Sequence, residues 1–330
     1  MNVLRKIGLL TAISAALLLM TSNVQAGGIK IALDSPPDLD KSGTYVWSHA
    51  FAAHLEENGL QTEFFQRDAL GGEEEKLDQI CTGLLEVSNS DLSKAGQLDP
   101  MIFGFYLPYL FTSMVHMDRV IEKTDLLDRI NAGLTKKGAR LLALIPVGGF
   151  SGIVNTKKPV KTPADMKGLR MRAMDKKQAM WLEAWGANSV IIPWAEIYNS
   201  LMTGVADGYL NAAIVQVMFK HTEVMKYFSD ARITSPLRVA LASEDWYSGL
   251  SEKEREIVHE AVSRANAANR VWQNKIEKSG LAAIEKAGVE VIPMTDAERE
   301  RFAKAVRPLY KDLVPADVAE AFLSAARAHQ

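Results

Sequence analysis

The spacing of apolar and polar residues changes repeatedly along the chain between short apolar runs and helical stripes. The run over residues 29–33 is typical of a buried strand. Trp47, Phe51 and Leu55 then follow at helical spacing and predict a helix over 44–58. The alternation continues with a strand over 61–65, a helix over 73–83 and a short strand over 85–90. Strands alternating with helices favour a parallel sheet covered by helices.

The same pattern starts again near residue 139. Short apolar runs predict strands over 139–146, 152–155, 168–172, 190–193 and 208–212. Residues 162–165 are typical of a turn or the start of a helix, and helices are predicted over 176–185 and 195–204. Two strand–helix blocks in series indicate an α/β protein with two lobes and a cleft between them.

Residues 251–288 have a different pattern, with helical periodicity and no Pro or Gly before Gly280. Ser251 can cap this helix, and Glu252 and Glu254 lie in its first turn, where the helix dipole favours anions. At a rise of ~1.5 Å per residue, the helix would be on the order of 40 Å long, enough to run across both lobes. An ordinary surface helix is the alternative, and length alone does not decide.

Residues 1–26 have the features of a secretory signal peptide. Arg5 and Lys6 precede an apolar run over 7–20, and Val24 and Ala26 supply small residues for cleavage after Ala26. The run is too short for a membrane-spanning helix, although an uncleaved anchor is the alternative. No Cys follows the cleavage point, so no lipid attachment is predicted. The cleaved chain is expected to be free in the exported compartment.

Composition narrows the classes of partner. Removing Arg5 and Lys6 leaves 36 of the 38 basic residues against 40 acidic ones, so the formal charge moves from −2 to −4. This balance does not favour a nucleic-acid partner or an anionic membrane surface. The single cysteine, Cys81, excludes an intramolecular disulfide.

Motifs that would indicate catalysis are incomplete. The segment 149–152 (GFSG) resembles a nucleophile elbow, but Ile153 stands where that motif needs Gly. His259 and Glu260 lack the second His of a zinc-protease helix, and there is no phosphate-binding glycine loop. We therefore predict no catalytic residue, no metal site and no cofactor.

The most informative positions lie in three segments, 167–172 (KGLRMR), 193–198 (PWAEIY) and 204–211 (GVADGYLN). On a strand over 168–172, Arg170 and Arg172 would point to the same face. Either could equally be a solvated surface charge, as most arginines are.

The order and spacing of motifs over essentially the whole chain after residue 26 resemble the periplasmic solute-binding proteins of TRAP transporters. The motifs are 70–73 (LGGE), 107–111 (LPYLF), 158–160 (KPV), 165–172 (DMKGLRMR), 196–198 (EIY) and 207–211 (DGYLN), followed by the long late helix. The resemblance implies a periplasmic binding protein-like fold. We predict a first lobe of residues 27–149 and about 238–277, and a second lobe of 150–237 and about 278–330.

The resemblance also implies roles for particular residues. Arg172 would bind the ligand carboxylate, Asn211 would line the site, and Trp194 would pack on the ligand. A guanidinium presents parallel donors that match a carboxylate, and an amide can donate or accept. Plain core packing is the alternative for Trp194. From the first lobe, Ser90 and Asp91 are the predicted contributors, with Asp91 facing a ligand hydroxyl, an amine or a water.

Two positions depart from the family pattern. Ser151, next to Phe150 in the predicted site, stands where many members carry a second Arg, and Leu210 stands where many carry Glu. Both changes remove charge, which favours a monocarboxylate with an apolar or aromatic body.

The prediction is thus a binding protein rather than an enzyme. It would capture a small organic acid anion by hinge closure, deliver it to TRAP membrane permease subunits and act as a monomer. A periplasmic sensor that presents the same ligand to a receptor is the alternative. An exported α/β hydrolase is less favoured, because no acid/base pair is evident.

Overall fold

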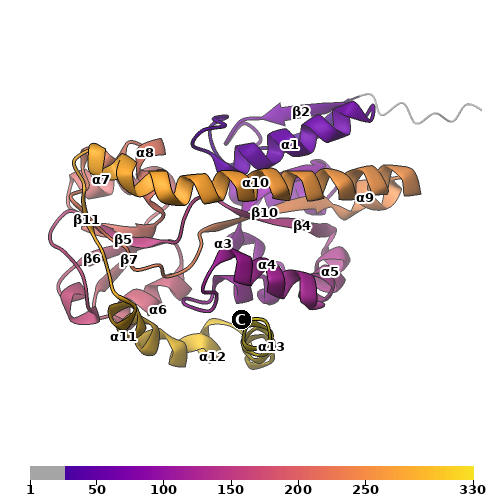
Figure 1. Cartoon of the computed structure of the whole chain (residues 1–330). Coiled ribbons are helices and arrows are strands. Elements are labelled where there is room, and N and C mark those ends of the chain that lie inside the picture. Colours follow the sequence, from indigo (N-terminus) through magenta and orange to yellow (C-terminus); the bar gives the residue numbers. More distant parts are fainter. Residues whose placement is uncertain (1–26) are drawn as a thin grey trace, which may run out of the picture.

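The computed structural model describes residues 27–330, so the predicted signal peptide lies outside the described residues. Two sheets form the centres of two lobes, seen side by side in Figure 1. The first sheet has the order β2-β1-β3-β10-β4. Its strands are β1 (Ile29–Ala32), β2 (Thr62–Phe65), β3 (Val87–Asp91), β4 (Ala139–Pro146) and β10 (Leu237–Ser243). Strand β1 is parallel to β2 and β3, whereas β10 is antiparallel to β3 and β4.

The second sheet has the order β11-β9-β5-β8-β6-β7. Its strands are β5 (Gly152–Asn155), β6 (Arg170–Ala173), β7 (Asn188–Ile191), β8 (Gly208–Asn211), β9 (Tyr227–Ser229) and β11 (Glu290–Ile292). Strand β6 is parallel to β7 and β8, and β5 is antiparallel to β8 and β9. Both sheets are therefore mixed rather than purely parallel. We call each sheet with the helices packed on it the first lobe and the second lobe.

Helices cover both sheets. The first lobe contains α1 (Gly43–Glu57), α2 (Glu73–Cys81), α3 (Leu92–Ala95), η1 (Pro100–Tyr106), α4 (Met114–Lys123), α5 (Leu126–Leu134), η2 (Thr135–Lys137) and α9 (Glu244–Gly249). The second contains η3 (Pro163–Met166), α6 (Lys176–Ala184), η4 (Trp194–Glu196), α7 (Ile197–Met202), α8 (Ala213–Met218) and η5 (His221–Glu223). In α1 the predicted stripe of Trp47, Phe51 and Leu55 is fully buried, which explains why this helix forms where it does.

Helix α10 (Glu252–Lys286) has 35 residues and runs along both lobes. Ser251 and Glu254 form a capping box at its start, each side chain bonding to the other's backbone. The helix packs on α1 and β4 of the first lobe and on α8 and β11 of the second. Figure 1 shows it running across the upper half of the molecule, below α1 and β2 in this view. The predicted helix across both lobes is thus confirmed.

The C-terminal helices return on the opposite side of the molecule (Figure 1). They are α11 (Asp296–Val306), η6 (Arg307–Leu309), α12 (Tyr310–Leu313) and α13 (Ala316–Ala328). Phe302 of α11 packs edge-on against Trp185 of the second lobe, but Phe322 of α13 packs edge-on against Phe105 of η1 in the first lobe. This differs from the prediction that residues 278–330 belong to the second lobe, because the apolar face of α13 is buried on first-lobe elements.

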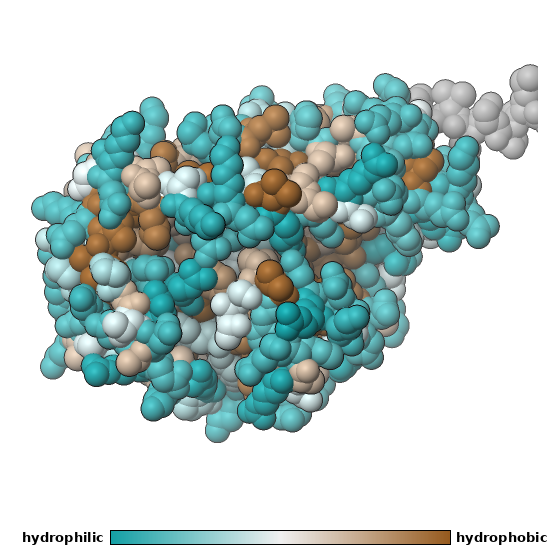
Figure 2. All heavy atoms as spheres, viewed as in Figure 1, coloured by the Kyte–Doolittle hydropathy of each residue, from teal (hydrophilic) through white to brown (hydrophobic). Residues whose placement is uncertain are grey.

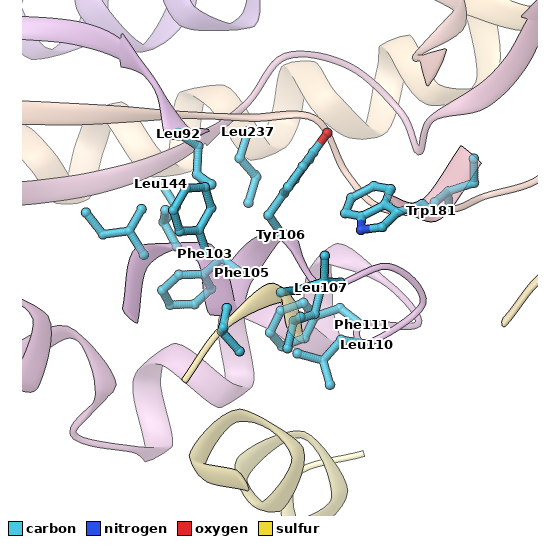
Figure 3. Close-up of a cluster of buried hydrophobic side chains, with 14 of the residues drawn as sticks. Leu92, Phe103, Phe105, Tyr106, Leu107, Leu110, Phe111, Leu144, Trp181 and Leu237 are labelled. Carbon is cyan, nitrogen blue, oxygen red and sulfur yellow. The ribbon is translucent and has the colours of Figure 1, made fainter. Parts of the chain in front are cut away.

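One hydrophobic cluster continues from one lobe into the other. Figure 3 shows its aromatic part, where Tyr106 of the first lobe lies next to Trp181 of the second. Their ring centroids are 4.7 Å apart. The outer surface in Figure 2 is mainly hydrophilic, with small separate apolar areas. Within residues 27–330, no helix has the length and apolar character needed to cross a membrane.

Candidate functional site

A cavity that opens to solvent lies between the two lobes and holds about 880 Å³ of space, solvent at its mouth included. The residues that line it are Asp34, Ser35, Ser42, Gly43, Thr44, Arg67, Asp91, Leu92, Ser93, Tyr106, Val147, Ser151, Arg172, Met174, Trp194, Leu210, Asn211, Val215, Met218, Phe219, Pro236, Leu237 and Arg238. Both sheets supply charged residues from their strands, Asp91 and Arg238 from the first and Arg172 from the second.

Arg172 on β6 is the cation on the second-lobe side of the cavity. Its side chain is only 7% exposed, and its Nε donates to the carbonyl oxygen of Ile192 at 2.9 Å. Burial lowers the pKa of this guanidinium, although an arginine stays charged at neutral pH. Among residues 27–330, no carboxylate lies within ion-pair distance of its terminal nitrogens, which are therefore available to a ligand. Its Cζ atom is 5.9 Å from the ring of Trp194.

Arg170, two positions earlier, is engaged elsewhere. Its backbone N–H donates to Asp207 Oδ2 at 2.8 Å, and its Nη2 lies 3.2 Å from Asp207 Oδ1. Its side chain is half-exposed and does not line the cavity. The strand therefore places Arg172 in the cavity, whereas Arg170 pairs with the buried Asp207 outside it.

The first-lobe side of the cavity holds an arginine between two carboxylates. Arg238 Nε donates to Asp34 Oδ2 at 2.7 Å, and Arg238 Nη1 lies 3.2 Å from Asp91 Oδ2. Burial alone would raise the pKa of Asp91, but Arg238 and hydrogen bonds from Ser93 outweigh it and lower this pKa. The same two carboxylates raise the pKa of Arg238. Arg238 is thus already neutralised within the protein.

Arg67 is also occupied. Its Nη1 donates to the backbone oxygen of Asp34 at 2.7 Å, and its Nε lies 3.4 Å from Asp68 Oδ2. Near it, the hydroxyl of Ser35 is hydrogen-bonded to those of Ser42 and Thr44 at 2.5 Å and 2.7 Å. This side of the cavity is therefore polar and rich in acceptors and hydroxyls.

Asn211 lies at the end of β8. Its Oδ1 accepts from the backbone N–H of Ala212 at 2.9 Å, which leaves the amide nitrogen as its free donor. Ser151 and Leu210, the two positions that depart from the family pattern, both line the cavity. Neither adds a charge there.

Trp194 forms part of an apolar wall. Its ring packs edge-on against Phe219 at 5.0 Å and Tyr209 at 6.0 Å between centroids. Behind it, the Tyr209 hydroxyl is 2.6 Å from His221 Nδ1. Burial, helped by the charge of Arg172, lowers the pKa of His221 to about 4, so this imidazole adds no cation at neutral pH.

The structure brings together five of the seven predicted site residues: Arg172, Asn211, Trp194, Asp91 and Ser151. Ser90 does not line the cavity but is fully buried, with its hydroxyl 3.1 Å from that of Ser88. Phe150 lines a second, smaller crevice and packs under Arg232. Ser90 comes one position before Asp91 in strand β3, so its side chain points to the other face of that strand.

Asp34, Tyr106 and Arg238 line the cavity and were not among the predicted site residues. Asp34 directly follows the predicted strand over 29–33, and strand ends are where open α/β sheets bind ligands. That signal could have identified it. Arg238 and Tyr106 have no comparable local signal, since the chain fold alone brings them to the cavity.

The arrangement suits anion binding. Both cavity carboxylates are tied to Arg238. Within residues 27–330, no group of three or more His, Cys, Asp or Glu side chains is placed to hold a metal ion.

Comparisons with known proteins agree with this geometry. The family model described as bacterial extracellular solute-binding protein, family 7, matches residues 38–316. The 2,3-diketo-L-gulonate-binding periplasmic protein YiaO of Escherichia coli is 27% identical over 261 residues, 78% of each chain. The ectoine-binding protein of the TeaABC TRAP transporter of Halomonas elongata superposes with a TM-score of 0.83 at 21% identity, over 92% of this chain and 100% of that one.

A TRAP periplasmic solute-binding protein from Bordetella bronchispeptica, with density interpreted as pantoate, gives a TM-score of 0.81. It is 25% identical and covers 90% of this chain and 99% of its own. The predicted family and two-lobe α/β fold are thereby confirmed. The chain belongs to family 7 of the bacterial extracellular solute-binding proteins, the periplasmic binding proteins of TRAP transporters.

Proposed function

We propose that the protein captures a small organic acid anion in the cavity between its lobes and delivers it to TRAP permease subunits without chemical change. The observation that carries this proposal is Arg172, a buried guanidinium whose terminal nitrogens have no carboxylate partner among the described residues. A buried charge without a partner is costly, and a ligand carboxylate would remove that cost. A bidentate pair would also fix the ligand's orientation.

The charges around the cavity favour one carboxylate on the ligand. Arg238 is held between Asp34 and Asp91, and Arg67 is bonded to the chain and to Asp68. Arg172 is then the one cavity arginine left for an anion among residues 27–330. A second carboxylate would approach Asp34 and Asp91 across the cavity and meet repulsion.

The remainder of the ligand would combine an apolar surface with hydrogen-bond donors. Trp194, Leu210 and Phe219 offer an apolar wall, while the first-lobe side offers carboxylates and hydroxyls. The relatives bind 2,3-diketo-L-gulonate, ectoine or a molecule interpreted as pantoate, which are all compact carboxylates. Pantoate has a single carboxylate, two methyl groups and two hydroxyls, and fits this description well. A sugar acid or a similar hydroxy acid is therefore the ligand class that we propose.

The proposal includes the cellular setting. Residues 1–26 would direct export and be removed after Ala26, and the released protein would act as a monomer in the periplasm. The family membership supports this location.

A thermal-shift screen of residues 27–330 tests the proposal. Pantoate, D-glucuronate, 2,3-diketo-L-gulonate, ectoine and the diacid D-glucarate form the panel, because a ligand that binds only the native state raises its melting temperature. We expect at least one monocarboxylate to raise it, and Arg172→Ala to abolish the shift. No shift with any carboxylate, or a shift of equal size in Arg172→Ala, would contradict the proposed function.

A further inference from the structure

Tyr106 brings an unassigned polar group to the cavity from the first lobe. It ends η1, lines the cavity together with Arg172 and is 7% exposed. Figure 3 shows its ring beside Trp181 and its hydroxyl oxygen pointing away from Phe105 and Leu107. The ring is therefore anchored in the apolar cluster, and the hydroxyl leaves that cluster.

The hydrogen bond to this hydroxyl comes from the other lobe. Gln178 of α6 is 2% exposed, and its Nε2 donates to the Tyr106 hydroxyl oxygen at 2.6 Å. The orientation of the Gln178 amide is fixed, because its Oε1 accepts from the backbone N–H of Met174 at 2.8 Å. A backbone N–H can only donate, so Oε1 must face Met174 and the NH₂ group must face Tyr106.

The direction of this bond leaves the phenolic proton without a partner. The Tyr106 oxygen accepts from Gln178, and no acceptor for its own O–H is found among residues 27–330. Burial raises the pKa of Tyr106 well above its usual value, so the proton stays in place at neutral pH. Buried donors in proteins nearly always have an acceptor, and here the cavity is where one can sit.

We propose that Tyr106 is a ligand-binding residue whose hydroxyl donates to an oxygen of the ligand carboxylate held by Arg172, and that Gln178 is the positioning residue that turns this proton toward the cavity. The inference rests on the proposed function, since it needs a carboxylate in the cavity. Tyr106 and Arg172 line the same cavity, so both face the space that the ligand would occupy.

This arrangement divides recognition of one carboxylate between the lobes. Arg172 belongs to the second lobe and Tyr106 to the first, and the residue that orients Tyr106 belongs to the second. The Tyr106 proton is directed correctly only when η1 and α6 are in contact. A carboxylate would therefore favour the closed arrangement over one in which these elements separate.

Titration calorimetry with Tyr106→Phe tests the proposal, with pantoate and D-glucuronate as probes. The variant keeps the ring and removes only the hydroxyl. A hydrogen bond to a charged group corresponds to roughly a tenfold to hundredfold change in Kd, and we expect a loss in that range. Tyr109→Phe is the matched control, because its buried hydroxyl has no hydrogen-bond partner within residues 27–330 and Tyr109 does not line the cavity. Its Kd should stay within about twofold of wild type.

Gln178→Glu provides the second test. The introduced carboxylate can still accept from the backbone N–H of Met174, but it cannot donate to Tyr106. It would instead accept the phenolic proton of Tyr106, which would then point away from the cavity. We expect weaker binding, and little further loss when Tyr106→Phe is added. Equal effects of Tyr106→Phe in the two backgrounds would contradict the positioning role, which a double-mutant cycle measures directly.

The possible outcomes distinguish a failure of the proposal for Tyr106 from a failure of the proposed function. If Arg172→Ala abolishes binding and Tyr106→Phe binds as tightly as wild type, the proposal for Tyr106 is wrong and the proposed function stands. If wild type binds no carboxylate, or Arg172→Ala binds as tightly as wild type, both are wrong. Calorimetric stoichiometry and circular dichroism show whether Tyr106→Phe has folded. If it has not, the effect of Gln178→Glu on Kd decides whether the proposal for Tyr106 stands.

Discussion

Arg232 Nη1 lies 2.7 Å from Glu277 Oε1, an ion pair that ties the chain between β9 and β10 to α10. The Cζ atom of Arg232 also lies 4.7 Å from the ring of Phe150, which belongs to the chain between β4 and β5. Arg232 thus links its own segment to two other segments that run between the lobes. Arg232 has a φ of 48°, an unusual conformation for a residue other than glycine.

Glu277→Gln should weaken this junction without unfolding the protein. Both side chains are about one-third exposed, so solvent screens the pair. We expect the free energy of unfolding to fall by only about 0.5 kcal/mol. The difference from wild type should shrink in 1 M salt, which urea unfolding at two salt concentrations measures. If the difference in unfolding free energy between Glu277→Gln and wild type does not depend on salt, the substitution acts through the packing around Phe150 rather than through charge.

Arg172→Ala should weaken ligand binding by about 3 kcal/mol or more, because it leaves a desolvated carboxylate unpaired. Arg172→Lys should recover only part of the affinity, since an ammonium cannot form the planar fork. Calorimetry with the best ligand of the screen measures both. Arg170→Lys is the control, because Arg170 is paired with Asp207 outside the cavity. An unchanged affinity in Arg172→Ala would remove Arg172 as the anchor.

Matched acids test the charge balance of the cavity. D-glucuronate and D-glucarate are similar in size but carry one and two carboxylates. We expect the monoacid to bind more tightly, because Arg238 is already engaged by Asp34 and Asp91. Tighter binding of the diacid would mean that Arg238 leaves its carboxylates to meet a ligand.

Protonation of His221 gives a prediction about stability and pH. Its pKa is lowered to about 4 in the folded protein, whereas an unfolded histidine titrates near its usual 6.5. Between these values the unfolded chain binds the proton and the folded chain does not. Stability is therefore complete above about pH 6.5 and declines as the pH falls toward 4, by at most ~3 kcal/mol. Urea unfolding from pH 7 to 4 should show a smaller decline in His221→Gln. An equal decline in both proteins would exclude His221 as its source.

Ligand should also change the shape of the protein. The cavity residues come from both lobes, so all contacts form together only when the lobes are closed. X-ray scattering should give a smaller radius of gyration with saturating ligand than without it. The fluorescence of Trp194 should change as well, with Trp194→Phe showing which part of the signal is its own. An unchanged radius with a verified ligand would indicate a pocket that is already closed.

The sequence predicted those strands and helices that depend on the spacing of neighbouring apolar residues and on capping residues. The strands 139–146 and 152–155 and the long helix after Ser251 agree with the structure to within a residue or two at each end. Strand β10 was not predicted, although it lies in the middle of the first sheet. Its place depends on pairing with β3 and β4, and no local pattern carries that information.

The same distinction applies to the cavity. Arg172, Asn211 and Trp194 stand in motifs of the family, so the sequence pointed to them. The pairing of Arg238 with Asp34 joins residues 204 positions apart. The bond from Gln178 to Tyr106 joins two lobes. A single sequence contains no signal for such contacts, because only the completed fold creates them.

The central position of β10 has a consequence for the order in which the molecule can be built. Residues 237–243 must be present before β3 and β4 can be joined in the first sheet. A ribosome releases the N-terminus first, so strands β1 to β4 are made well before the strand that unites them, and the first sheet cannot be completed until Ser243 has been added.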